Sequence, residues 1–225
     1  MSGLIGVGLY TPAEAGRLLH VAPAKISRWL NGHSIRGREY PALWEPAVQI
    51  DGASTTLAFR DLMEIRVADA FLRAGVSAIQ VRAAIVYARE VLGADYPLST
   101  ERFKTDGRNI LLRVFEKDAD GVERERLLNL FRRQYEFKEV IEPILRTVDF
   151  DEDGSPRLWY PAGRRANILV DPLRAFGQPI DGVTSVPTAI LATSAGNFGI
   201  EETAIAYDVP EGSVRRAVEF EQSLN

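Results

Sequence analysis

The sequence predicts a mainly α-helical protein with a few small β-hairpins. Apolar residues recur every three to four positions in several stretches, which is the period of an amphipathic helix. Thr11 with Glu14, and Ser77 with Gln80, have the spacing of helix capping boxes. Asp-Gly pairs separate short strand-like runs in the middle of the chain. Together these features indicate a helical framework that carries hairpins.

Residues 11–32 predict two short helices around a tight turn, a helix-turn-helix. Pro12 and Pro23 suit the first positions of the two helices, and Gly32 marks the end of the second. The second helix leaves four side chains off its apolar stripe: Lys25, Ser27, Arg28 and Asn31. These can donate hydrogen bonds to phosphates and base edges, so we expect them to bind DNA. The alternative is an ordinary helical hairpin with a solvated face.

The next stretch, 33–48, predicts a short β wing or a covering loop, because its two prolines prevent a long helix. Its apolar residues are Ile35, Tyr40, Leu43 and Trp44. Arg36 and Arg38 flank Gly37 and can touch the DNA backbone as wing residues do, although a solvated basic loop explains them equally well. These elements define a first domain over residues 9–54, a helix-turn-helix with a wing.

A second region, residues 55–163, is expected to link the ends or to dimerise. It begins with helices over 57–74 and 77–92, which pack together, against the first unit, or across a dimer. Further elements are expected in this order: a hairpin of 102–105 with 110–115 around Asp106-Gly107, a turn at Asp120-Gly121, a helix over 127–147 limited or kinked by Pro143, a hairpin of 148–150 with 157–160, and a linker at 161–165.

The last domain, residues 164–225, ends in a second pair of short helices over 200–207 and 212–222. Residues 166–225 carry three basic and eight acidic groups, whereas residues 1–60 carry six basic and four acidic groups. An acidic helix pair matches a phosphate backbone poorly, so we expect this end to bind protein. The net charge of −4 also argues against nonspecific coating of nucleic acid.

Enzyme chemistry finds little support in the sequence. There is no cysteine, and the two histidines, His20 and His33, lack a metal-ligand spacing. The acidic residues of 149–153 could hold a divalent cation, but solvated charge at a turn is the usual explanation. We therefore expect a non-enzyme without catalytic residues, metal or cofactor. No signal peptide or membrane-length apolar run is present, so we expect a cytoplasmic protein with no membrane partner.

Several segments of the C-terminal domain form a family pattern: Ile168-Leu-Val-Asp-Pro172, Phe176-Gly-Gln-Pro-Ile180, Gly199-Ile-Glu-Glu-Thr-Ala-Ile-Ala-Tyr207 and Val214-Arg-Arg-Ala-Val-Glu-Phe220. They resemble a small bacterial domain, trihelical and homeodomain-like, that recurs in antitoxins of PIN-like toxins. One motif departs from the family, because Val183-Thr-Ser-Val-Pro187 replaces Gly-Thr-Arg-Ile-Pro. With the helix-turn-helix, the whole chain looks like a VapB-type antitoxin, and its N-terminal half resembles the MerR-type arrangement more weakly.

The resemblance implies that the protein neutralises a PIN-like ribonuclease toxin and represses the shared operon by binding operator DNA. An inhibitor can block substrate access or displace the metal with a cation, and the candidate toxin-binding residues are Arg164, Arg165, Arg174, Arg215 and Arg216. We also expect a homodimer, because one recognition helix makes few base contacts, and a hetero-oligomer with the toxin. The alternatives are a stand-alone MerR-like transcriptional regulator that senses a small molecule and an adaptor that binds only proteins.

Overall fold

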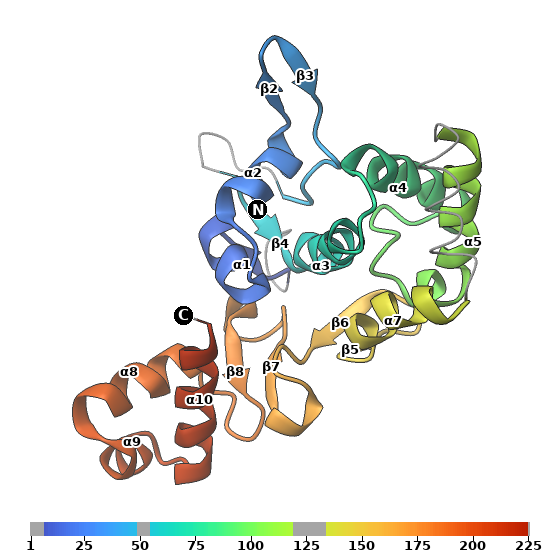
Figure 1. Ribbon diagram of the computed structural model, residues 1–225. Coiled ribbons are helices and arrows are strands. Elements are labelled where there is room, and N and C mark those ends of the chain that lie inside the picture. The colour runs from blue at the N-terminus through green and yellow to red at the C-terminus, as the bar shows by residue number, and fades with distance from the viewer. Residues whose placement is uncertain (1–6, 49–54, 119–133, 225) are drawn as a thin grey trace.

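The computed structural model describes residues 7–48, 55–118 and 134–224 (Figure 1). The protein is mainly helical and carries small antiparallel sheets, which confirms the predicted fold class at this level. Within these ranges, no helix combines the length and the apolar content that a membrane span requires. The turn expected at Asp120-Gly121 and the first part of the helix expected over 127–147 lie outside the described residues.

Two short helices and two strand pairs form the N-terminal part. Its elements are β1 (Leu9–Tyr10), α1 (Pro12–Leu19), α2 (Pro23–Asn31), β2 (His33–Ile35), β3 (Arg38–Tyr40) and β4 (Leu57–Ala58). The predicted capping box is present, since the Glu14 N–H donates to Thr11 Oγ1 at 3.2 Å and the Thr11 N–H donates to the Glu14 carboxylate at 2.7 Å. The turn between α1 and α2 requires a glycine, because a Cβ at Gly16 would lie 2.5 Å from the carbonyl oxygen of Val21.

The stretch expected as a wing is a β-hairpin that projects from the body of the protein (Figure 1). Strands β2 and β3 pair antiparallel around Arg36 and Gly37, whose φ angles of 51° and 79° fit a two-residue type I′ turn. Leu43 and Trp44 follow the hairpin and are buried against the body. The Trp44 indole N–H donates to Asp61 at 3.0 Å, which anchors this segment.

The main core lies around two helices, α3 (Phe59–Arg73) and α4 (Ala78–Leu92), close to the spans predicted from the sequence. The Ser77 capping box that opens α4 is present. Helix α4 ends at Gly93, whose φ of 64° suits the left-handed cap that the sequence predicts there. Burial of Phe71, Leu62 and Ile85 in this core fixes α3 and α4 against each other.

The hairpin expected around Asp106-Gly107 is wrong, because these residues belong to a helix, α5 (Glu101–Asp118). The buried positions Phe103, Gly107, Ile110, Leu111 and Val114 recur with a helical period and line one face. A Cβ at Gly107 would lie 2.8 Å from the Phe103 ring. The glycine therefore serves close packing inside a helix and does not mark a turn.

A four-stranded antiparallel sheet follows α7 (Gln134–Leu145), which contains Pro143 near its end. Its strands, in both chain and sheet order, are β5 (Val148–Phe150), β6 (Pro156–Trp159), β7 (Ile168–Val170) and β8 (Pro179–Asp181). The predicted β5–β6 hairpin is confirmed. Residues 161–165, expected as a linker, connect two paired strands and include the start of the 3₁₀ helix η1 (Arg164–Ala166). The sheet thus crosses the expected boundary at 164, and the domain division stays a prediction.

Three helices end the described chain: α8 (Thr188–Phe198), α9 (Ile200–Tyr207) and α10 (Glu211–Ser223). They pack together around a small second core of Leu191, Ala204, Val214 and Ala217. The last turn of α10 also places Phe220 and Leu224 in the main core, and Glu221 forms an ion pair with Arg17 of α1 at 3.2 Å. Helix α10 therefore joins the C-terminal helices to the N-terminal part.

Glu64 is a fully buried carboxyl group on α3. It accepts the backbone N–H groups of Leu98 at 3.1 Å and Ser99 at 3.0 Å, which holds the segment before α5 against α3. Burial raises the pKa of Glu64 from 4.5 to about 7, because desolvation of the charged form outweighs these hydrogen bonds.

Protein stability should therefore fall as pH rises from about 4.5 to about 7, since the folded state binds this proton more tightly than the unfolded state does. The shift corresponds to about 3 kcal/mol in the free energy of unfolding. Chemical unfolding at pH 5 and pH 8 should show this difference in the wild type and much less of it in Glu64→Gln. Glu139→Gln, at an exposed site on α7, is the control. Equal pH dependence in wild type and Glu64→Gln would contradict the assignment.

Candidate functional site

The polar face of α2 leaves Arg28 exposed and Ser27 half-buried. The Arg28 Nε donates to the carbonyl oxygen of Ala24 in its own helix at 3.2 Å, which leaves its terminal nitrogens without a described partner. Asn31 is also exposed, and its side-chain amide donates to Thr55 at 2.7 Å. Arg28 is therefore the side chain of this face that is best placed to reach an external acceptor.

Lys25 lies on α2 but is committed to the body of the protein. Its Nζ forms an ion pair with Asp69 of α3 at 2.9 Å and lies 4.8 Å from the centre of the Trp29 ring. Asp69 is buried and also pairs with Arg73 at 2.5 Å. A phosphate contact by Lys25 would have to compete with this carboxylate. In the structure, the ion pair instead holds α2 against α3.

The β2–β3 hairpin carries the other two arginines that the sequence assigns to DNA. Arg36 is exposed at the tip, and no described residue forms an ion pair with it. Arg38 lies on β3, and its side chain is outside the described part of the structure. The hairpin thus offers at least one basic side chain to solvent, beside the exposed end of α2 (Figure 1).

Arg164 is held by a dense set of contacts. It donates to Asp149 at 2.7 Å and to the carbonyl oxygens of Arg146 and Val148 at 3.1 and 3.2 Å, and it lies 4.7 Å from the centre of the Tyr160 ring. Burial acts to raise the pKa of Asp149, but the hydrogen bond and charge of Arg164 hold it below its usual value.

Arg165, the neighbouring candidate, is exposed, and no described residue forms an ion pair with it. It is therefore more accessible to an external carboxylate than Arg164, which would first have to leave its own partners.

The other three arginine candidates also have partners. Arg174 contacts Asp171 at 2.5 Å and Ser185 at 2.9 Å. Arg215 pairs with Glu211 at 2.8 Å on the surface of α10. Arg216 reaches the fully buried Asp181 of β8 at 2.7 Å, and this arginine keeps the pKa of Asp181 low against the opposing effect of burial. This ion pair thus connects α10 to strand β8 of the sheet.

The loop that contains η2 (Ala175–Gly177) carries the candidate Arg174 and leaves Leu173 and Phe176 77% and 79% exposed, an exposure that the sequence did not reveal. Ala175 and Phe176 have φ angles of 46° and 54°, although neither is a glycine. Consecutive left-handed residues of this kind are strained and are found mainly at functional positions. No periodic signal exists for such a loop, so its two apolar side chains are identified by conformation and exposure.

The loop is nevertheless rigidly supported. The N–H of Leu173 donates to Asp171 at 2.9 Å, and the buried Tyr10 hydroxyl donates to the carbonyl oxygen of Gly177 at 2.7 Å. Arg174 bridges the loop to Ser185 in the next turn. Two apolar side chains are therefore displayed on a preorganised backbone, and we name this element the 173–176 loop.

Exposed large hydrophobic side chains concentrate in the C-terminal part. Of the ten in the described chain, seven lie between residues 173 and 207: Leu173, Phe176, Val183, Ile190, Phe198, Ile205 and Tyr207. Single exposed apolar residues are normally scattered, so this concentration along the chain makes the C-terminal part the candidate protein-binding region.

Metal-ligating groups do not converge in the described residues, where no group of three or more His, Asp or Glu side chains could hold an ion. In the acidic 149–153 segment, Asp149 contacts Arg164, and Asp153 accepts the backbone N–H of Ser155 at 2.8 Å. His20 adopts a left-handed conformation at the end of α1, and its backbone N–H donates to Gly16. These residues therefore take part in turns, caps and ion pairs.

The chain is similar over nearly its whole length to a protein of the antitoxin class. The relative is a Mycobacterium tuberculosis protein described as "Putative antitoxin VapB45", which is 29% identical over 224 residues and is covered over 93% of its length. This similarity supports the VapB-type resemblance found in the sequence and does not favour the stand-alone regulator. No family model matches the chain.

A solved structure has the same overall architecture. The X-ray structure of Rv2018 from Mycobacterium tuberculosis superposes with a TM-score of 0.75 at 26% identity, over 95% of this chain and 99% of that one. The N-terminal helices, the sheet and the C-terminal helices therefore form one arrangement that a known protein shares.

Proposed function

We propose that the chain is the antitoxin of a type II toxin–antitoxin module. It binds and neutralises a PIN-like ribonuclease toxin and represses its own operon by binding promoter DNA. The observation that carries the proposal is the similarity to the VapB45 relative over 95% of the chain. The proposed role is regulatory and cytoplasmic, and it requires no catalysis by this chain.

The DNA-binding half of the proposal rests on α1, α2 and the β2–β3 hairpin. Helix α2 acts as the recognition helix of a helix-turn-helix, and the hairpin acts as its wing. The exposed Arg28 reads a base edge, with Ser27 and Asn31 beside it, and Arg36 contacts phosphate from the hairpin tip. Lys25 has a positioning role, because its ion pair with Asp69 fixes α2 on the body.

The toxin-binding half rests on the apolar surface between residues 173 and 207. Interfaces draw most of their binding free energy from a few aromatic and arginine side chains in a well-packed centre. The 173–176 loop has this composition, since it presents Leu173 and Phe176 beside Arg174. We place the centre of the toxin interface there.

Charge complementarity supports the same assignment. Glu201, Glu202 and Glu211 are exposed on α9 and α10, and a nuclease surface that grips RNA is basic around its metal site. Close to the metal-binding carboxylates of such a nuclease, a cation on the antitoxin becomes favourable instead. Arg165 is free to supply that cation, so the acidic helices would form the rim of the interface.

The proposal includes a homodimer. The apolar face of α3 is buried within the subunit, whereas α4 leaves Val86 and Val91 exposed. These two residues are the candidate contacts between subunits, and two recognition helices would double the base contacts to the operator.

Co-expression with the adjacent gene tests the whole assignment. The chain should copurify with the gene product, remove its ribonuclease activity, and show the mass of a complex that contains two copies of the chain in light scattering. An unrelated PIN-like ribonuclease is the control and should remain active. If the product of the adjacent gene remains active and does not copurify with the chain, the antitoxin assignment is overturned.

Deletion of residues 164–225, the predicted C-terminal domain, is a simple way to test whether this end binds the toxin and leaves promoter binding to the rest of the chain. The structure shows why this deletion tests the proposal poorly. It removes β7 and β8 from the sheet and takes Phe220 and Leu224 out of the main core. Substitutions of exposed side chains in the full chain avoid this loss of stability.

A further inference from the structure

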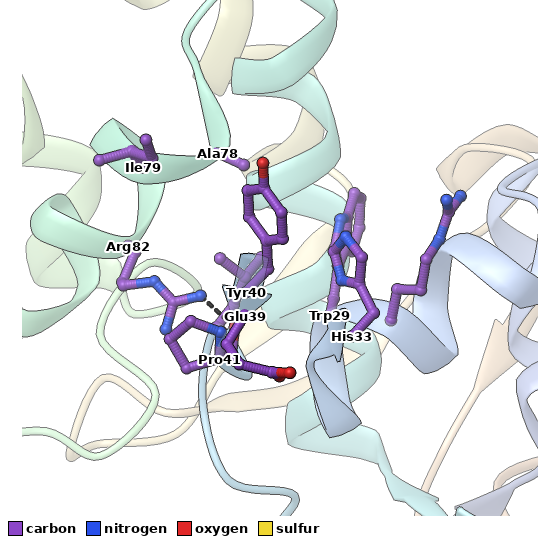
Figure 2. A pocket seen from close by; sticks show the side chains of 10 residues that line it. Trp29, His33, Glu39, Tyr40, Pro41, Ala78, Ile79 and Arg82 are labelled. Carbon is purple, nitrogen blue, oxygen red and sulfur yellow. Dashed lines mark hydrogen bonds between the residues drawn. The ribbon is translucent and has the colours of Figure 1, made fainter. Parts of the chain in front are cut away.

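A pocket of about 250 Å³ lies between α2, the β2–β3 hairpin and the beginning of α4 (Figure 2). Its walls are mainly aromatic and aliphatic: Trp29, His33, Tyr40, Pro41, Leu43 and Ile79. Ligand pockets are typically about 300–1,000 Å³ and mostly apolar, with a few placed polar groups. This pocket is slightly smaller than that range, so it suits a compound with a single ring.

His33 supplies a polar group inside the pocket. Its ring stacks on Tyr40, with the ring centres 5.0 Å apart and the planes 10° from parallel. Its Nδ1 is buried, and no described residue provides a hydrogen-bond partner for it. Buried polar atoms nearly always have a partner, so this atom calls for a hydrogen-bonding group, which a bound ligand provides once the His33 ring turns its Nδ1 toward the pocket. A hydroxyl group can serve either tautomer of the imidazole, because it both donates and accepts.

The charged side chains that line the pocket favour an anion. Arg28 and Arg82 contribute two guanidinium groups, and Glu39 contributes one carboxylate. Arg82 donates to the carbonyl oxygens of Pro41 and Ala42, which fixes its position on the wall (Figure 2). The terminal nitrogens of Arg28 match a carboxylate in shape and charge, and Arg82 adds positive charge while its own terminal nitrogens donate to the backbone.

We propose that this pocket binds a small aromatic acid that carries a ring hydroxyl. The ring lies among Trp29, His33 and Tyr40, the hydroxyl pairs with His33 Nδ1, and the carboxylate faces Arg82 and Arg28. Such a ligand contacts α2 and the hairpin together and engages Arg28. On the proposed function, under which Arg28 reads operator DNA, the ligand therefore weakens operator binding by about fivefold or more.

Isothermal titration calorimetry of the full chain tests the site without operator or toxin. The probes are 4-hydroxybenzoate, benzoate and, as a non-aromatic acid, cyclohexanecarboxylate. We expect a Kd between about 10 µM and 1 mM for 4-hydroxybenzoate, about tenfold weaker binding of benzoate, and no detectable binding of cyclohexanecarboxylate.

Two variants locate the ligand. His33→Phe keeps a ring that can stack on Tyr40, so benzoate should still bind while the preference for 4-hydroxybenzoate disappears. Ala78→Leu, at an exposed position that lines the pocket, should fill it and weaken both acids at least about tenfold. Ala206→Leu makes the same change at an exposed position of α9 and should bind like the wild type.

Each result decides one part of the proposal. Absence of binding to the wild type up to about 10 mM, or wild-type binding by Ala78→Leu, overturns the site. A hydroxyl preference that survives in His33→Phe overturns the placement of the hydroxyl. Operator affinity that is unchanged by a bound ligand overturns the regulatory effect. Because the calorimetry needs no DNA, failure of the site leaves the antitoxin assignment intact, and failure of that assignment leaves the site intact.

Discussion

Replacing Leu173 with serine and Phe176 with asparagine in one chain should weaken toxin binding by about 100-fold or more. The two side chains are the most exposed large hydrophobic residues in the described structure, so their loss removes apolar contacts with a partner rather than internal packing. Interface anchors of this kind cost about 2 kcal/mol or more each when truncated. At a toxin concentration that the wild type neutralises, the variant should leave the ribonuclease active.

The choice of asparagine at position 176 separates binding from folding. Phe176 has a φ of 54°, and asparagine tolerates the left-handed region better than most residues. The contacts that hold the 173–176 loop come from Asp171, Arg174 and Tyr10, which all remain in the variant. The free energy of unfolding should therefore stay close to that of the wild type.

Two further variants make the result specific. Ile79→Ser, at an exposed apolar position of α4 outside the proposed contacts between subunits, should leave toxin binding unchanged. Phe198→Ser with Ile205→Ser should weaken it less than the loop variant, because Ile205 lies on α9, which belongs to the proposed rim, and Phe198 ends the neighbouring α8. A full loss of neutralisation in the rim variant and wild-type behaviour in the loop variant would move the interface to α8 and α9. Wild-type affinity in both would remove the C-terminal surface from the proposal.

Much of the fold could be predicted because its signals are local. Capping boxes, end-of-helix glycines and a period of three to four residues located α1 to α4 within a few residues. The error at α5 also has a local cause: Asp106-Gly107 has the composition of a turn, and the reason for its glycine is the ring of Phe103 one turn earlier. Packing of that kind is not visible in the order of residue types.

The candidate sites were harder to predict, because a sequence shows a charge but not its partner. Lys25 and Arg28 look equivalent along α2, yet Lys25 pairs with Asp69, which lies 44 residues later, while Arg28 is exposed. Arg216 likewise reaches a buried carboxylate 35 residues away. The 173–176 loop has no periodic pattern, although it contains the candidate Arg174, and the pocket beside α2 also needs α4, which the sequence places far from α2 and the hairpin.

Arg28→Ala should weaken operator binding by about 1–3 kcal/mol and relax the base preference at one position of each half-site. The expectation follows from its place on the exposed face of α2, where only its Nε has a described partner. Arg36→Ala should weaken all DNA sequences alike and reduce the slope of log K against log salt by about one, as loss of a single phosphate contact does. The sequence assigns a phosphate contact to Lys25 as well, but its ion pair with Asp69 makes that substitution a test of α2 positioning.

Fluorescence titrations with the chain's own promoter and with a scrambled duplex, each at several salt concentrations, measure both effects. Arg146→Ala is the matched control, because it removes one exposed arginine from the α7 end of the protein and gives the same change in net charge. Its operator affinity and salt slope should follow the wild type, since a distant charge acts only through the screened field of the whole molecule. If the folded Arg28/Arg36 double alanine variant binds the promoter as tightly as Arg146→Ala does, then α2 and the hairpin do not contact DNA. Both helix pairs would then be assigned to protein contacts, and the protein would be the adaptor that the sequence also allows.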